Sequence, residues 1–172
     1  KGHYQISIHS ETKCCTGFNY HPEPQGLNWR TNLYYLETLD FGKSWQNAAG
    51  ETVDLPVTTP DNNARVHDYA TEGLKVYLKD IRLDDQDRPV ILYVVSKGYE
   101  SGPENGPRTW MIAQWTGSEW SINPITESDS NYDTGSLYLE SDGTWRIIAP
   151  TEPGPQPYNP GGEMAMWVNT DQ

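Results

Sequence analysis

The stretch Thr38-Leu39-Asp40-Phe41-Gly42-Lys43-Ser44-Trp45 decides the fold of this chain. It has the form of a hairpin turn, in which Asp40 accepts hydrogen bonds from the turn's own backbone N–H groups and Gly42 allows a positive φ. Trp45 then places a large aromatic ring in the gap between neighbouring sheets. A single ordinary hairpin beside a tryptophan is the alternative, and the rest of the chain decides between the two.

Short β-branched and aromatic segments recur along the chain, and each leads through a Gly/Pro-bearing loop into a second strand. The first members of these pairs are Tyr4–His9, Val90–Ser96 and Trp145–Thr151, and the second members are Asn32–Leu39, Thr109–Thr116 and Glu163–Thr170. Further strands are expected at Lys43–Gln46, Leu74–Arg82, Glu119–Asn123 and Ser136–Glu140. Helical patterning is nearly absent. Four antiparallel strands recurring every ~50–60 residues are typical of a β-propeller blade.

The expected fold is therefore all-β, a propeller of four-stranded antiparallel blades of which this chain covers about three. We expect a single partial propeller over residues 1–172, with blade 1 at about 1–50, blade 2 at about 74–123 and an incomplete blade 3 at about 135–172. Propellers have typically ~4–8 blades, so missing blades or other copies in a homo-oligomer would complete the ring. Unpaired blade faces would invite association. A β-sandwich is the alternative fold.

Composition excludes several classes of protein. The formal net charge of −12 argues against nucleic-acid binding, which needs a basic face. The sequence contains no long apolar run of the kind that predicts a membrane span. Seven Trp and eleven Tyr against two Phe suit packing between blades and stacking on sugars. Cys14 and Cys15 are adjacent and are expected to be reduced, partly buried thiols rather than a vicinal disulfide, with no functional role.

The loops of a propeller collect at two ends of the ring. We expect one end, the mouth, to be bordered by the candidate site residues His9, Tyr20, His21, Arg30, Arg65, His67, Tyr69, Arg108, Tyr132 and Tyr158. The opposite end carries charged turn residues. Among these, Asp84, Asp85 and Asp87 are candidate ligands of a structural calcium ion, although their loop lacks the EF-hand pattern. No other metal site or cofactor is expected.

His, Tyr and Arg together suit one chemistry. Arginine binds a uronate carboxylate bidentately and acidifies the adjacent C5 proton, which a neutral His or a Tyr can remove. A second Tyr or His protonates the departing glycosidic oxygen, which completes a β-elimination. Hydrolysis would instead need two carboxylates, for which Asp68, Asp129, Asp133 and Glu152 are the candidates. Each of these residues also has a structural alternative, as a loop-fixing or packing side chain.

The strand pattern, the turn at Thr38–Trp45 and segments such as Arg30–Tyr35 and Trp145–Pro150 resemble the BNR/Asp-box repeat proteins of bacteria, in the sialidase-like superfamily. The resemblance identifies Thr38, Asp40, Gly42 and Trp45 as the structural Asp-box positions. Within that superfamily the chain resembles the propeller polysaccharide lyases of the ulvan-lyase type. That resemblance implies His21, Tyr69 and Arg108 as catalytic residues, with His9, Arg30 and His67 behind them. The substrate-binding candidates are Tyr20, Arg65, Tyr132 and Tyr158.

The resemblance implies a secreted, extracellular or periplasmic protein that binds a polysaccharide or oligosaccharide. Lyase-type cleavage of an acidic, uronate-containing polysaccharide is the leading expectation. The alternatives are a non-catalytic propeller that binds glycan or protein, and an Asp-box glycoside hydrolase. Sialidases rely on an arginine triad, a Tyr/Glu pair and an acid Asp, and this set is not identifiable in the sequence.

Overall fold

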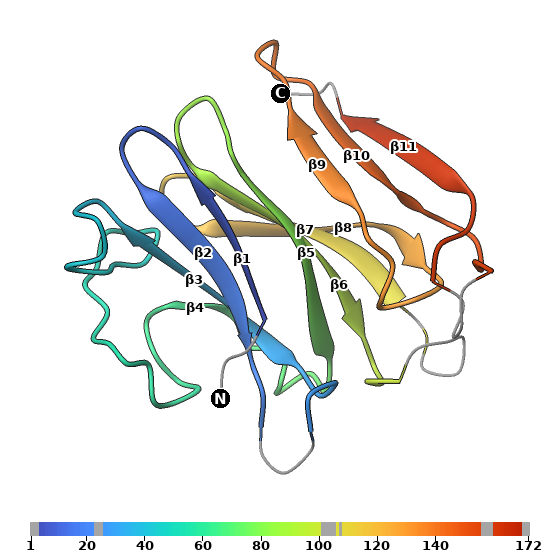
Figure 1. Ribbon diagram of the computed structural model, residues 1–172, viewed down its shortest axis with the longest axis horizontal. Coiled ribbons are helices and arrows are strands. Elements are labelled where there is room, and N and C mark those ends of the chain that lie inside the picture. Colours follow the sequence, from blue (N-terminus) through green and yellow to red (C-terminus); the bar gives the residue numbers. More distant parts are fainter. Residues whose placement is uncertain (1–3, 23–25, 101–105, 107, 156–159, 170–172) are drawn as a thin grey trace.

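The computed structural model describes residues 4–22, 26–100, 106, 108–155 and 160–169, and all of its regular elements are strands. Within these ranges no helix is long and apolar enough to cross a membrane. The strands form three antiparallel sheets that pack side by side, which we call sheets A, B and C (Figure 1).

In each sheet the strands lie in the order in which they occur in the chain. Sheet A contains β1 (Gln5–His9), β2 (Cys14–Tyr20), β3 (Thr31–Thr38) and β4 (Arg65–His67). Sheet B contains β5 (Lys75–Leu83), β6 (Pro89–Ser96), β7 (Arg108–Trp115) and β8 (Trp120–Ser128). Sheet C contains β9 (Ser136–Leu139), β10 (Trp145–Pro150) and β11 (Met164–Asn169). The predicted all-β class with four-stranded antiparallel units is confirmed, whereas the predicted blade boundaries stay predictions.

Sheet A differs from the expected strand pattern. Residues 14–20 form β2, although they were expected to lie in a loop. The buried positions of β2 are Cys15, Gly17 and Asn19, which do not stand out as an apolar alternation. Space at Gly17 is tight, because a Cβ there would lie 3.3 Å from the Ile6 side chain, which would have to shift slightly. The expected strand at Lys43–Gln46 is reduced to bridges of Gln46 with Glu37 and Thr52, and β4 is the fourth strand instead.

Two hydrophobic cores separate the three sheets, and β6 contributes to both. Ile91, Tyr93 and Val95 face sheet A, while Val90, Leu92 and Val94 face sheet C. Every residue of β6 is buried. Apolar side chains on both faces are expected for a strand in a sheet covered on both sides, since neither face meets water.

In the Thr38–Trp45 turn Asp40 accepts a backbone hydrogen bond as predicted, and Thr38 accepts a further one. The Ser44 N–H donates to Asp40 Oδ1 at 2.9 Å, the Gly42 N–H donates to Thr38 Oγ1 at 2.8 Å, and Gly42 has a φ of +86°. The prediction for Trp45 is wrong, because its ring lies outside the two inter-sheet cores. It packs with Tyr34, Leu36, Val53 and Ala64 on the other face of sheet A, and residues after the turn help to cover that face.

A pair of side chains joins sheet B to sheet C. Asp80 Oδ2 accepts the Leu137 N–H at 2.9 Å, and Arg82 Nε donates to the Leu137 carbonyl at 2.9 Å. Asp80 and Arg82 also form an ion pair of 3.2 Å. Both backbone groups of Leu137 are thus satisfied by the inner strand of the neighbouring sheet. We call Asp80, Arg82 and Leu137 the inter-sheet clamp.

The connections define two ends of the molecule. The turns between β1 and β2, β5 and β6, and β9 and β10 lie at the top of Figure 1, and the β2–β3 connection lies at the bottom. The bottom end is the one at which the sequence predicts the mouth.

Candidate functional site

Arg30 lies among three tyrosine rings at the mouth end. Its guanidinium carbon is 3.6 Å from the ring centroid of Tyr4, 5.1 Å from that of Tyr77 and 5.7 Å from that of Tyr132. The rings come from the segment before β1, from β5 and from the β8–β9 connection. Within the described ranges Arg30 forms no ion pair, and its Nε donates weakly to the Leu27 carbonyl at 3.4 Å.

His21 belongs to the same group. It follows β2 directly, is 4% exposed, and its ring centroid is 5.4 Å from that of Tyr4. Its Nδ1 lies 3.4 Å from the Gly26 carbonyl. The Tyr77 and Tyr132 rings are 5.9 Å apart in an edge-to-face arrangement. We call His21, Arg30, Tyr4, Tyr77 and Tyr132 the mouth cluster.

Lys79 lies beside the mouth cluster on the inner strand of sheet B. The β5–β6 register shifts between Leu78 and Asp80, which places Lys79 at a β-bulge. Bulges redirect side chains and are common next to functional sites. The Lys79 Nζ donates to the Asn131 carbonyl at 2.7 Å. Burial, together with the nearby charge of Arg30, lowers the pKa of Lys79 to about 7, against the opposing effect of Asp133.

Arg108 begins β7 in the same region and is only 2% exposed. Its Nη2 donates to the Glu100 carbonyl at 3.3 Å. Burial lowers the pKa of Arg108. Electrostatic interactions with the Tyr77 hydroxyl and with the carboxylates of Asp129 and Asp133 oppose this downward shift. Burial has the opposite effect on the carboxyl group of Asp133, whose pKa it raises.

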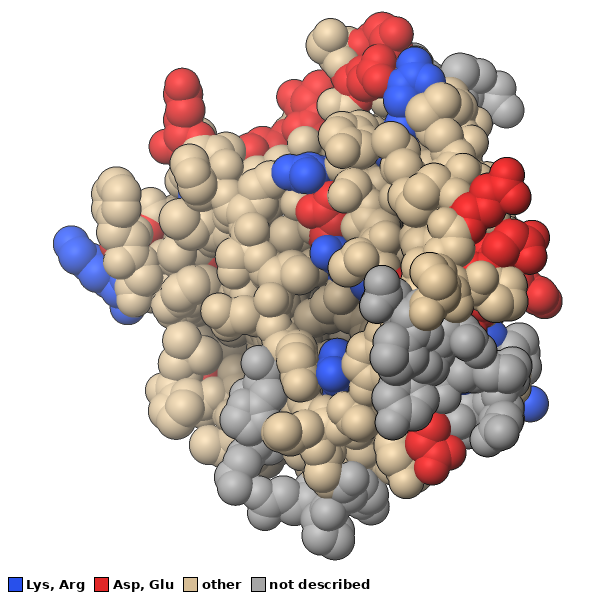
Figure 2. All heavy atoms as spheres, turned by 45° about the vertical axis from the view of Figure 1, so that its right-hand side comes forward, with Lys and Arg blue, Asp and Glu red and all other residues tan. Residues whose placement is uncertain are grey.

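The charged groups are distributed unevenly over the surface. In Figure 2, carboxylates gather along the upper and right-hand margins, whereas separate Lys or Arg atoms lie among uncharged ones nearer the middle. In this chain of net charge −12, some Lys and Arg side chains thus lie apart from the carboxylates, whereas others lie beside them at the margins. A few such cations are enough to attract an anionic ligand.

The structure brings together only part of the predicted site. His21, Arg30 and Tyr132 meet in the mouth cluster, and Arg108 lies near Tyr77. The expectation that His9 borders the mouth is wrong. Because β2 follows after a short turn, His9 ends β1 at the opposite end, in a hollow that Asp84 and Asp87 also line.

Two predicted tyrosines are packing residues instead of mouth residues. Tyr69 is 3% exposed in the core between sheets A and B, and its hydroxyl lies 2.7 Å from that of Tyr93. Burial raises the pKa of Tyr69 to about 12. Tyr20 packs with Tyr34 on the other face of sheet A. Tyr158 lies outside the described residues.

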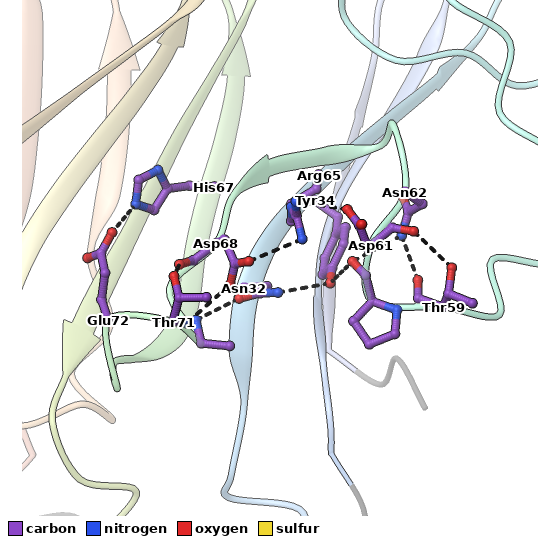
Figure 3. A network of polar contacts seen from close by, with 12 residues as sticks. Asn32, Tyr34, Thr59, Asp61, Asn62, Arg65, His67, Asp68, Thr71 and Glu72 are labelled. Carbon is purple, nitrogen blue, oxygen red and sulfur yellow. Dashed lines mark hydrogen bonds and ion pairs between the residues drawn. The ribbon is translucent and has the colours of Figure 1, made fainter.

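Arg65 and His67 lie on β4, the outer strand of sheet A, in a polar network of their own (Figure 3). Arg65 forms ion pairs with Asp61 at 2.9 Å and Asp68 at 3.2 Å. The His67 Nε2 lies 2.5 Å from a Glu72 carboxylate oxygen. These contacts fix the segment between sheets A and B, and they leave both side chains occupied with local partners.

Sequence reasoning missed Tyr4, Tyr77, Lys79 and Asn131. Tyr4 and Tyr77 fit strand patterns, so nothing separated them from packing residues. Lys79 did not stand out either, because β5 also contains Lys75, Asp80 and Arg82. Among the described residues no group of three or more His, Cys, Asp or Glu side chains could hold a metal ion. The carboxylates of Asp84 and Asp87 instead accept hydrogen bonds from neighbouring side chains and turn N–H groups.

Comparisons with known proteins indicate the family to which this chain belongs. A model of the BNR repeat-containing family matches residues 19–128. A solved polysaccharide lyase of family PL25, an ulvan lyase, superposes with a TM-score of 0.69 at 18% identity, covering 98% of this chain and 39% of that one. A PL25 ulvan lyase bound to -[GlcA(1-4)Rha3S]- gives a TM-score of 0.65 at 17% identity, with the same coverages. No curated protein sequence matches.

The chain thus spans 39% of the length of these two solved relatives, and at this identity they show the fold alone. The three sheets form part of a β-propeller, as predicted. Together with the family match over most of the chain, this shows that the protein belongs to the BNR repeat-containing family.

Proposed function

We propose that this chain carries part of the substrate site of a carbohydrate-active propeller that cleaves an acidic polysaccharide by β-elimination. The observation that carries the proposal is Arg30, whose guanidinium is stacked among three tyrosine rings and has no ion pair within the described ranges. Stacking holds the planar group in one orientation and leaves its N–H edges to bind a carboxylate. The solved relative bound to a glucuronate-containing saccharide supports the same substrate class.

In this mechanism the Arg30 guanidinium binds the uronate carboxylate and stabilises the negative charge that develops there. A neutral His21 removes the C5 proton, and the C5–H electron pair forms the C4–C5 double bond. The C4–O bond breaks, and a tyrosine protonates the departing oxygen. Tyr132 is placed for this step, because its ring centroid lies 5.7 Å from the guanidinium carbon of Arg30. Tyr132 thereby takes the role that the sequence gave to Tyr69.

The test follows the ultraviolet absorbance of the unsaturated uronate product on a panel of uronate polysaccharides. We expect His21→Ala to lower the rate by about a hundredfold or more, the usual effect of losing an acid–base group. Arg30→Met should lower it by about a hundredfold or more as well, because it removes a group that stabilises the developing charge. His9→Ala is the matched control, because His9 lies at the opposite end and should leave the rate unchanged. Equal losses in all three variants would overturn this assignment of the site.

Two other functions are outcomes of the same experiment. Reducing ends without ultraviolet absorbance would indicate a glycoside hydrolase, for which Asp133 with its raised pKa is the candidate acid. Saturable binding of a saccharide without any product would indicate a non-catalytic glycan-binding propeller. In each case we propose that the protein acts outside the cytoplasm, as a secreted or periplasmic protein, where polysaccharides are met.

A further inference from the structure

A small hollow lies where the β7–β8 turn meets the segment that follows the Thr38–Trp45 turn. Trp115 and Trp120 pair with each other across the β7–β8 turn and line the hollow from sheet B. Residues 47–49 and 63–65 line it from the segment after β3. Its volume is about 120 Å³, many times the ~10–15 Å³ that one water molecule needs, so it has room for a small organic ligand.

The hollow lies at the end of the molecule opposite the mouth. The β7–β8 turn and the β5–β6 turn share one end of sheet B, because Val90 at the start of β6 pairs with Gln114 near the end of β7. Arg88 joins the two turns by donating to the Thr116 carbonyl at 3.0 Å. The β5–β6 turn lies at the top of Figure 1. The hollow is therefore separate from the mouth cluster.

Three aromatic rings lead from the core to this hollow. Tyr35 is 1% exposed, and its ring centroid lies 5.5 Å from that of Trp120. The Trp120 ring in turn lies 5.7 Å from the Trp115 ring, and both contacts are edge-to-face. Both indole rings are half-buried. Because each ring is held by the ring behind it, the indoles present a preorganised aromatic surface.

The polar groups that line the hollow are neutral or neutralised. Arg65 is the only cation among the lining residues that the structure describes, and it is paired with Asp61 at 2.9 Å and Asp68 at 3.2 Å. The Asn63 Nδ2 donates to a backbone carbonyl at 3.0 Å, which leaves its amide oxygen to accept a hydrogen bond. Aromatic surface with a few neutral polar groups suits a neutral sugar, which has both C–H faces and hydroxyl groups.

We propose that Trp115, Trp120 and Asn63 form a second saccharide site, which binds a neutral sugar ring. An acidic sugar is disfavoured, because Arg65 is already neutralised and the chain as a whole has a net charge of −12. Such a site would hold a polysaccharide away from the mouth while the mouth acts on it. That role rests on the proposed function, whereas binding of the sugar does not.

The indole N–H signals of Trp115 and Trp120 report on this hollow. In a two-dimensional ¹H–¹⁵N spectrum, they are assigned by their loss in Trp115→Phe and Trp120→Phe, and the other tryptophans serve as internal controls. The protein is titrated with glucose, xylose, rhamnose and sodium glucuronate at constant ionic strength. We expect saturable shifts of both signals with a neutral sugar, at a dissociation constant of about a millimolar, as is usual for so small a ligand. Glucuronate should bind at least about tenfold more weakly.

Trp115→Ala should weaken binding of the neutral sugar by roughly tenfold, because it removes a stacking surface. Ser118→Ala is the matched control, since Ser118 lies in the same turn but does not line the hollow. The backbone amide signals show whether each variant is folded, and the wild-type titration tests the site even if Trp115→Ala does not fold.

The two proposals fail separately. Arg30→Met should abolish cleavage of a uronate polysaccharide but leave the sugar titration within about twofold. Saturable shifts in a protein without lyase activity would support this site and refute only the proposed function. If no neutral sugar gives a saturable shift, if all tryptophan signals shift alike, or if folded Trp115→Ala binds as the wild type does, the second site is wrong. Glucuronate binding as tightly as the neutral sugars would contradict the neutral ligand.

Discussion

The burial of Lys79 makes the stability of this fold depend on pH. The unfolded chain keeps the lysine proton up to the ordinary pKa of 10.5, whereas the folded chain releases it near 7. Between these values the unfolded state binds more protons, so the free energy of unfolding rises with pH. Asp133 opposes this shift and Arg30 adds to it.

We therefore expect Lys79→Met to raise the free energy of unfolding relative to the wild type, and to do so most at and below neutral pH. The difference in free energy of unfolding between variant and wild type should change steadily from pH 7 to pH 10, as the wild type becomes more stable. Denaturant unfolding at a series of pH values measures it. Lys43→Met changes an exposed lysine and should give a pH-independent difference. A pH-independent difference for Lys79→Met as well would contradict the effect.

At the scale of single residues, the sequence predicted which end of the molecule Arg30 and His21 occupy, but it did not predict which side chains surround them. Arg30 and His21 could be placed at the mouth because both lie in the connection between β2 and β3. The stacking around Arg30 could not, because Tyr4, Tyr77 and Tyr132 come from three separate segments. Tyr69 was misplaced because a crossover residue can turn inward to a core as easily as outward to the mouth.

Among the elements, the inter-sheet clamp predicts a local effect on sheet C. Asp80→Ala leaves the Leu137 N–H without its acceptor and removes the partner of Arg82. We expect a loss of about 1.5–3 kcal/mol in the free energy of unfolding, the usual contribution of hydrogen bonds to charged groups. Amide hydrogen exchange should accelerate in β9 and β10 more than in β6.

The control for the clamp is Asp85→Ala, which removes an exposed carboxylate from the β5–β6 turn. It should leave exchange in sheet C unchanged. Uniform acceleration across all three sheets in Asp80→Ala would show global destabilisation, and would contradict a specific role of the clamp between sheets B and C.

The Thr38–Trp45 turn predicts an acid-dependent stability. Hydrogen bonds from Ser44 and Thr38 lower the pKa of Asp40 to about 2, from an ordinary value of 3.8. The carboxylate therefore stabilises the fold above the ordinary value, and this contribution is lost as pH falls through about 2. Asp40→Ala should lower the melting temperature at pH 7, and the gap to wild type should narrow below pH 3. Lys43→Ala, in the same turn, should have little effect.

Strand prediction succeeded where burial left an apolar pattern. The strands of sheets B and C lie close to their predicted ranges, because β6, β7 and β10 are rich in aromatic and β-branched residues. It failed for β2, whose buried positions include a glycine and an asparagine. Asn19 is buried because its Nδ2 donates to the Val76 carbonyl across the sheets, and this long-range contact leaves no local signal.

At the scale of the whole molecule, the outer face of sheet C carries several exposed apolar side chains in the part of the chain that the structure describes. Met164, Met166 and Val168 are 57%, 54% and 44% exposed along one side of β11, and Tyr138 on β9 is 46% exposed, with Arg146 of β10 between Tyr138 and Val168. Exposed apolar patches of this kind favour association. We expect concentration-dependent self-association through this face, measured by sedimentation velocity.

Met166→Glu should shift the protein towards monomer, because it places a charge in the centre of this face. Phe41→Glu is the matched control, since Phe41 is fully exposed but stands alone on a turn. If the two variants associate alike, or if the wild type stays monomeric at all concentrations, another surface or none is responsible.

The covering of sheet A by its own following segment has a consequence for biosynthesis. Because Val53 and Ala64 pack on its outer face, sheet A can fold as this part of the chain leaves the ribosome without displaying that face. Sheet B then adds to the remaining face, and sheet C adds to sheet B. While these sheets form, sheet A therefore presents one apolar face rather than two, which limits misassembly between neighbouring chains on a polysome.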